Sequence, residues 1–186
     1  LWRWQAAAQI FERVGPDNAR AHRAFANALL HLEQWSAAEG VLQVLLEMTG
    51  DEKDALHELT VCRLKLGRGD DALESAHRLA AISGNAGRGN VLLGKIHETQ
   101  NNTRLTIKFW KRVLEIHPDA EGLQVSPGEF TAMYGSALLD GGQPEEAVSM
   151  LKRSVKTRPH AETFVMIGKA YIQLNRKPEA IAAWKQ

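Results

Sequence analysis

The feature that most constrains this chain is a spacing of about 34 residues that recurs along most of the sequence. One series of small side chains has this spacing, and an apolar residue follows each member four places later. Its members are Ala38, Ala72, Thr106, Ala147 and Ala180. A second series has the same phase and comprises Ala26, Thr60, Gly94, Gly135 and Gly168. Both series advance by 34, 34, 41 and 33 residues, which predicts repeats of one supersecondary unit.

The step of 41 residues contains an insert, which we place at 121–127. The insert ends in Ser126-Pro127-Gly128-Glu129. A serine at the N-cap, a proline at the first helical position and a glutamate at N3 form a capping box. This segment is therefore expected to start a new helix.

Each repeat is predicted to contain two amphipathic helices. In residues 20–33, apolar residues such as Phe25 and Leu29 recur with helical spacing, and residues 35–48 carry a second stripe after a break at Gln34. The later breaks contain the Gly, Asn and Pro residues that short turns require. No stretch alternates with the two-residue period of a strand, so we expect an all-α chain.

The last repeat carries a recognisable motif. It consists of Phe164, Ile167-Gly168, Tyr171, Ala180 and Trp184. These residues fit the pattern W-x2-L-G-x2-Y, A-x3-F of the tetratricopeptide repeat (TPR), and the chain resembles that family over almost its whole length. The resemblance implies a right-handed α-α superhelical solenoid of antiparallel helix pairs.

The resemblance also implies one TPR solenoid over residues 1–186, with about five repeats and a partial one at the N-terminus. We place a partial repeat at 2–18, repeats at 19–52, 53–86, 87–120 and 128–160, and an incomplete repeat at 161–186. Both ends look like cuts through a longer protein. We expect the apolar residues near them to associate with other copies or with further repeats.

Composition and residue spacing argue against several classes of function. The net charge of +1 gives the chain no overall attraction to nucleic acid or to an anionic membrane. Its apolar runs are far below the roughly 18 residues of a membrane span. The seven histidines are scattered and form no metal-ligand pattern, and Cys62 is expected to be a buried small apolar residue. We therefore expect no catalytic residue, no metal and no cofactor.

In the TPR family, the first helix of each repeat lines a concave groove that binds partners. On this chain, the resemblance assigns to the groove Arg20, Arg23, Asn27, His31, His57, Glu58, Lys65, Arg88, Lys95, Met133, Ser136, Met166 and Lys169. The N-terminal half of this set has a basic excess, and the C-terminal half is apolar. The two methionines either adapt to an apolar ligand or pack between neighbouring helices; both interpretations remain open at this point.

One TPR subclass clamps the acidic C-terminal tails of heat-shock chaperones, and the sequence argues against it. Arg23, Asn27 and Arg88 match the clamp approximately. However, Glu58 stands where the clamp has an asparagine, and Leu92 replaces its last cation. A carboxylate facing the carboxylate of a ligand is repulsive, so we do not expect an acidic tail in this groove.

We therefore predict a non-catalytic scaffold that binds a peptide or a helix of another protein. The alternatives are a self-assembling structural scaffold and a docking segment of a larger bacterial protein, such as a transferase. Alanine- and glycine-rich helices with arginine-rich turns favour a bacterial source, and we expect the bacterial cytoplasm or periplasm. The sequence does not name a partner.

Overall fold

The computed structural model describes residues 18–186, in which there are ten α-helices and no β-strand. The prediction of an all-α chain is confirmed for these residues. The partial repeat expected at 2–18 lies outside them, except for Asn18. The chain divides into two compact units between Leu92 and Leu93, and each unit is described by itself.

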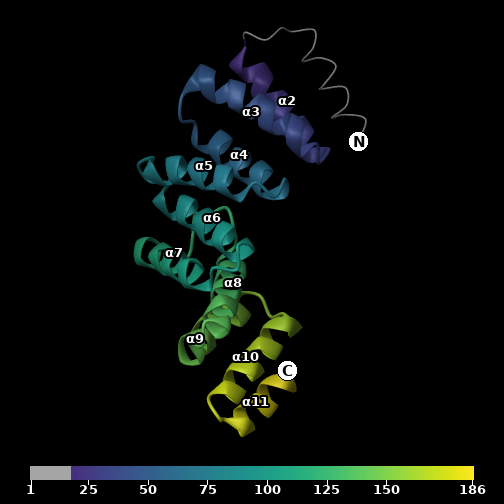
Figure 1. Cartoon of the computed structure of the whole chain (residues 1–186). Coiled ribbons are helices and arrows are strands. Elements are labelled where there is room, and N and C mark those ends of the chain that lie inside the picture. Colours follow the sequence, from purple (N-terminus) through teal and green to yellow (C-terminus); the bar gives the residue numbers. More distant parts are fainter. Residues whose placement is uncertain (1–17) are drawn as a thin grey trace. The chain divides into compact units, whose positions relative to one another are not determined.

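The first unit contains α2 (Ala19–His31), α3 (Trp35–Thr49), α4 (Lys53–Lys65), α5 (Gly69–Ala81) and the beginning of α6 (Ala86–Thr99). The second contains the rest of α6, α7 (Thr103–Ile116), α8 (Pro127–Asp140), α9 (Pro144–Thr157), α10 (Ala161–Gln173) and α11 (Lys177–Trp184). Helices adjacent in sequence pack as pairs, as Figure 1 shows for α2 with α3 and for α4 with α5.

Some of the helices, including α2 and α8, begin at residues whose side chains accept hydrogen bonds from free backbone amides. The Asn18 side chain accepts hydrogen bonds from the amides of Arg20 and Ala21 at 2.9 and 3.3 Å. Ser126 accepts one from the amide of Glu129 at 3.2 Å, and Pro127 is the first residue of α8. The predicted helix start after the insert is therefore confirmed, and a serine cap of this kind contributes about 1 kcal/mol.

The turns within successive helix pairs share one backbone requirement. Each contains a residue with a positive φ, between 56° and 73°, in the left-handed region. These residues are Glu33, Gly67, Asn101, Gly142 and Asn175, and they follow the spacing of the small-residue series. Glycine and asparagine tolerate this conformation best, so the Gly and Asn residues of the breaks have a steric cause. Glu33 is the exception.

The small residues of the second series lie where paired helices cross. A Cβ atom added at Gly94 would overlap the indole of Trp110, and one added at Gly168 would overlap the indole of Trp184. Only glycine allows the two backbones to approach this closely with a tryptophan between them. The helix α6 thus packs on α7 through the same contact by which α10 packs on α11.

In the first unit, buried polar side chains form contacts between helices. The Thr60 hydroxyl donates a hydrogen bond of 2.8 Å to the Ser75 hydroxyl, and both side chains are fully buried. The Glu39 carboxylate, also buried, forms ion pairs with Arg63 and Arg68. The bond between Thr60 and Ser75 joins α4 to α5. The ion pairs of Glu39 join α3 to α4 and to the turn that precedes α5. A buried charge such as that of Glu39 is tolerated only when it is paired.

Candidate functional site

One cavity of the first unit is lined mainly by α2 and α4. Its volume is about 360 Å³. It is lined by Asn27, Leu30, His31, Trp35, His57, Glu58 and Val61. The residues from α2 recur at helical spacing, and so do those from α4, so each helix presents one face to the cavity. We call these seven residues the α2–α4 pocket.

Four of the predicted groove residues meet in this pocket, namely Asn27, His31, His57 and Glu58. Two others lie beside it or at its edge. The Nη1 atom of Arg23 donates to Glu58 Oε2 at 2.5 Å, and the Nζ atom of Lys65 lies 5.8 Å from the centre of the Trp35 ring.

The expected basic excess of this region is compensated by carboxylates. Arg23 pairs with Glu58 and also with Glu52, whose carboxylate caps the first turn of α4. Arg88 pairs with Asp54 at 2.8 Å. The two arginines near the pocket, Arg23 and Arg88, therefore already have carboxylate partners, which reduces their attraction for an acidic ligand.

Burial shifts the titration of two pocket residues. Desolvation raises the pKa of Glu58, although the charge of Arg23 opposes this shift. Desolvation, with a contribution from Arg88, lowers the pKa of His57 to about 4. His57 is therefore neutral at pH 7 and offers one donor and one acceptor, while the Glu58 carboxylate would be stabilised by a further hydrogen-bond donor.

The remaining predicted residues lie elsewhere in their own units. Arg20, Lys95 and Lys169 are exposed, while Met133 and Ser136 are half-buried on α8. Met166, on α10, borders a cavity of about 270 Å³ in the second unit.

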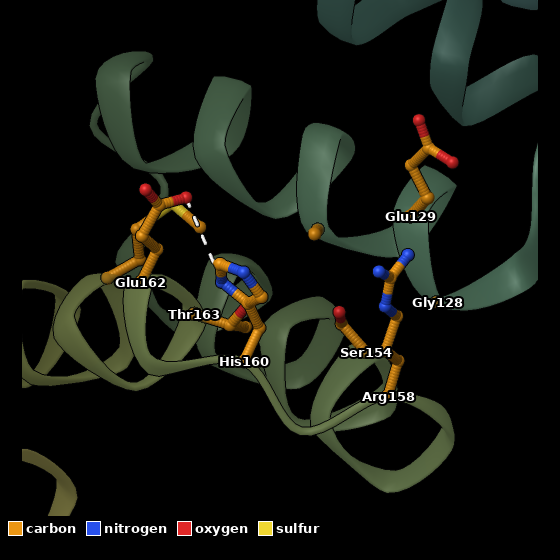
Figure 2. Close-up of a pocket in the computed structure, with 9 residues that line it drawn as sticks. Gly128, Glu129, Ser154, Arg158, His160, Glu162 and Thr163 are labelled. Atoms are coloured by element: carbon orange, nitrogen blue, oxygen red, sulfur yellow. Dashed lines mark ion pairs between the residues drawn. The ribbon is translucent and has the colours of Figure 1, made fainter.

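This second cavity lies among α8, α9 and α10 (Figure 2). Sequence reasoning missed its polar residues, which include Arg158, His160 and Glu162. Figure 2 shows the Arg158 side chain extending toward the first turn of α8, and His160 Nδ1 lies 3.8 Å from Glu162. These residues lie at or near the connection between α9 and α10, outside the helix positions that the family pattern assigns to a groove.

In the described part of the chain, the side-chain types that commonly bind metal ions are dispersed. In residues 18–186, no three His, Cys, Asp or Glu side chains are placed to hold a metal ion. Cys62 is fully buried, and burial raises the pKa of its thiol to about 12, so the thiol stays protonated at neutral pH. Across the same residues, none of the helices has both the length and the hydropathy to cross a bilayer.

The comparisons with known proteins agree with the fold. Sequence models of the tetratricopeptide repeat match residues 3–60 and 133–185. A comparison with the sequences of curated proteins finds no match.

Among solved structures, a MamA protein is similar, with a TM-score of 0.76 and 14% identity over 90% of this chain and 88% of that one. MamA from Desulfovibrio magneticus RS-1 also has a TM-score of 0.76, with 13% identity over 90% of this chain and 91% of that one. YrrB, described as a TPR protein with an unusual peptide-binding site, has a TM-score of 0.73 and 18% identity, over 96% and 88% of the two chains. At these identities the likeness concerns the fold. Together with the two sequence matches, it establishes that the chain belongs to the tetratricopeptide repeat family.

Proposed function

We propose that this protein is a non-catalytic scaffold that binds a peptide segment or a helix of another protein. The observation that carries the proposal is the convergence of Asn27, His31, His57 and Glu58 on the α2–α4 pocket. Polar side chains that converge on an apolar cavity are typical of a binding site.

The pocket combines two kinds of surface. Leu30, Trp35 and Val61 supply apolar walls, and Asn27 and Glu58 supply hydrogen-bonding groups. A ligand that inserts an apolar side chain and donates an N–H group to Glu58 would satisfy both. Because burial raises the pKa of Glu58, a donor from the ligand would favour its ionised form.

The same geometry disfavours an acidic tail at this site. The ligand's carboxylate would face Glu58, and the nearby cations Arg23 and Arg88 already pair with Glu58 and Asp54. This supports the rejection of the chaperone clamp. In the second unit, the proposal assigns Met133, Ser136, Met166 and Lys169 to partner binding on α8 and α10.

The family supports a binding role, since TPR arrays present helical surfaces to other proteins and one similar structure, YrrB, is described as having a peptide-binding site. To test the proposal, a random peptide library would be selected on the wild-type protein. Hydrogen exchange would then be compared with and without the selected peptide. The proposal predicts new protection in α2 and α4, whereas protection only in other helices would contradict it.

A second candidate function is self-association, and the difference in exposure between two equivalent tryptophans favours it. Trp110 and Trp184 each lie against a glycine of the preceding helix. Trp110 is fully buried, with Phe130 of α8 edge-on at 6.3 Å between ring centroids. Trp184 is 49% exposed, and Ile181 beside it on α11 is 51% exposed. A second copy that covers this surface would complete the same type of contact.

A further inference from the structure

The second unit contains a cavity with a different character, on the exposed side of α7. Its volume is about 550 Å³. It is lined by three cations, Arg104, Lys108 and Lys111, and by Thr103, Ile107, Gly141 and Gln143. The three cations are exposed, while Thr103 and Ile107 are half-buried. We call this cavity the α7 basic pocket.

The three cations lie on one face of α7, and their charges are not neutralised by ion pairs within the described residues. Their spacing of four and then three residues places them in one row along α7. In the part of the chain that the structure describes, no carboxylate forms an ion pair with any of the three. Like charges at this spacing destabilise a helix, and ion pairs with other residues in the described range 18–186 do not relieve this free-energy cost.

Beside the cations, the lining of the pocket is partly apolar and closely packed. A Cβ atom added at Gly141 would lie 2.5 Å from Ile107 Cδ1 and 3.4 Å from Thr103 Cγ2. The turn between α8 and α9 therefore packs closely on α7, and the missing side chain leaves the cavity open. An acidic side chain fits this arrangement, because its methylene stem can rest on Ile107 while its carboxylate meets the cations.

We propose that the α7 basic pocket binds a short acidic segment of a partner protein, through two or three Asp or Glu side chains. Residues 104–111 span only about 10 Å of helix, which suits a few carboxylates. Asp140 and Glu145 are exposed and close in sequence to the lining residues Gly141 and Gln143, so an anion that extends beyond the three cations would meet repulsion there. This favours an acidic peptide over nucleic acid or a membrane surface. The site is independent of the α2–α4 pocket and of the function proposed for it.

The test measures binding of a fluorescent hexaglutamate peptide to the whole chain, with hexaglutamine as the uncharged comparison. Lys108→Gln/Lys111→Gln removes two cations from the pocket. Arg112→Gln/Lys156→Gln removes two exposed cations outside it and is the matched control. We expect hexaglutamate to bind more tightly than hexaglutamine. The pocket variant should lose about fivefold or more in affinity, because exposed pairs contribute modestly, and the control should stay within about twofold.

Three results would overturn the proposal. The first is equal or undetectable binding of the two peptides. The second is an equal loss in both double variants, which would show a general charge effect. The third is tighter binding of a thymidine oligonucleotide or of phosphatidylserine vesicles than of hexaglutamate, with the same dependence on Lys108 and Lys111.

Discussion

The indole of Trp110 packs against the backbone of Gly94, at a point where any side chain on residue 94 would overlap the ring. Trp110 is fully buried, so its ring has no open space into which it could move. Gly94 therefore sets how closely α6 and α7 approach, and the tryptophan fills the space beside it.

Replacing Gly94 with leucine should overpack this crossing. We expect Gly94→Leu to lower the free energy of unfolding by about 1–3 kcal/mol or more. The matched control is Gly40→Leu, because a Cβ atom at Gly40 has no neighbour within 4 Å and the residue lies inside α3. That change should stabilise the helix by up to about 1 kcal/mol. Urea unfolding of both variants measures the difference, and equal effects would show that Gly94 does not form a tight crossing.

Glu33 should be replaceable by glycine with a gain in stability. Its φ of 56° is unfavourable for a residue with a Cβ atom, and the equivalent turns use glycine or asparagine. We expect Glu33→Gly to raise the free energy of unfolding by about 0.5–1 kcal/mol. Gln43→Gly, in the middle of α3, should lower it by about as much. A loss of stability in both variants would contradict the role assigned to this turn.

The stability of the protein should fall as the pH drops from about 6.5 to about 4. The pKa of His57 is lowered from 6.5 to about 4 in the folded state, mainly by burial. The unfolded chain therefore binds a proton first, and the folded state loses about 1–3 kcal/mol across this interval. Glu58 acts in the opposite direction at the acidic end, because its pKa is raised.

This dependence can be isolated by comparing thermal unfolding of the wild type with that of His57→Gln across the same pH range. The variant should lose part of the slope, whereas His160→Gln, at an exposed position, should retain it. If His57→Gln has the wild-type slope, His57 is not held neutral by the fold.

Trp184 should promote association of copies as the concentration rises. Burial of one large apolar side chain contributes about 1.5–3 kcal/mol, so Trp184→Glu should shift light scattering toward the monomer. Val44→Glu is the control, because Val44 is 40% exposed and lies in the first unit. A wild-type protein that stays monomeric from micromolar concentration upward would contradict self-association.

The periodic features were predictable from the sequence, because they depend on local constraints that every repeat must meet. The crossing at Gly94 is of this kind, and the helix start at Ser126 follows from an equally local capping pattern in the insert. The pairing of Arg23 with Glu52 was not predictable, since the two residues are far apart in sequence and follow no repeat pattern. The compensation of the predicted basic excess could be recognised only once the helices were placed side by side.

Two cavities in the second unit were likewise not predictable from the sequence. Arg104, Lys108 and Lys111 have a visible helical spacing, but the contact of Gly141 with Ile107 depends on packing between helices. Arg158 and His160 were not predicted as site residues, because the family pattern considers only the first helix of each repeat.

Binding of a partner segment in the α2–α4 pocket is tested most directly by calorimetry with variants in which the pocket is blocked. The ligand would be a peptide selected on the wild-type protein. Asn27→Trp places a large ring in the pocket, and Gln43→Trp adds the same ring to an exposed position of α3. We predict that Asn27→Trp weakens binding by about tenfold or more, which corresponds to about 1.4 kcal/mol, while Gln43→Trp binds as the wild type does. Equal affinities for the two variants would contradict binding in this pocket.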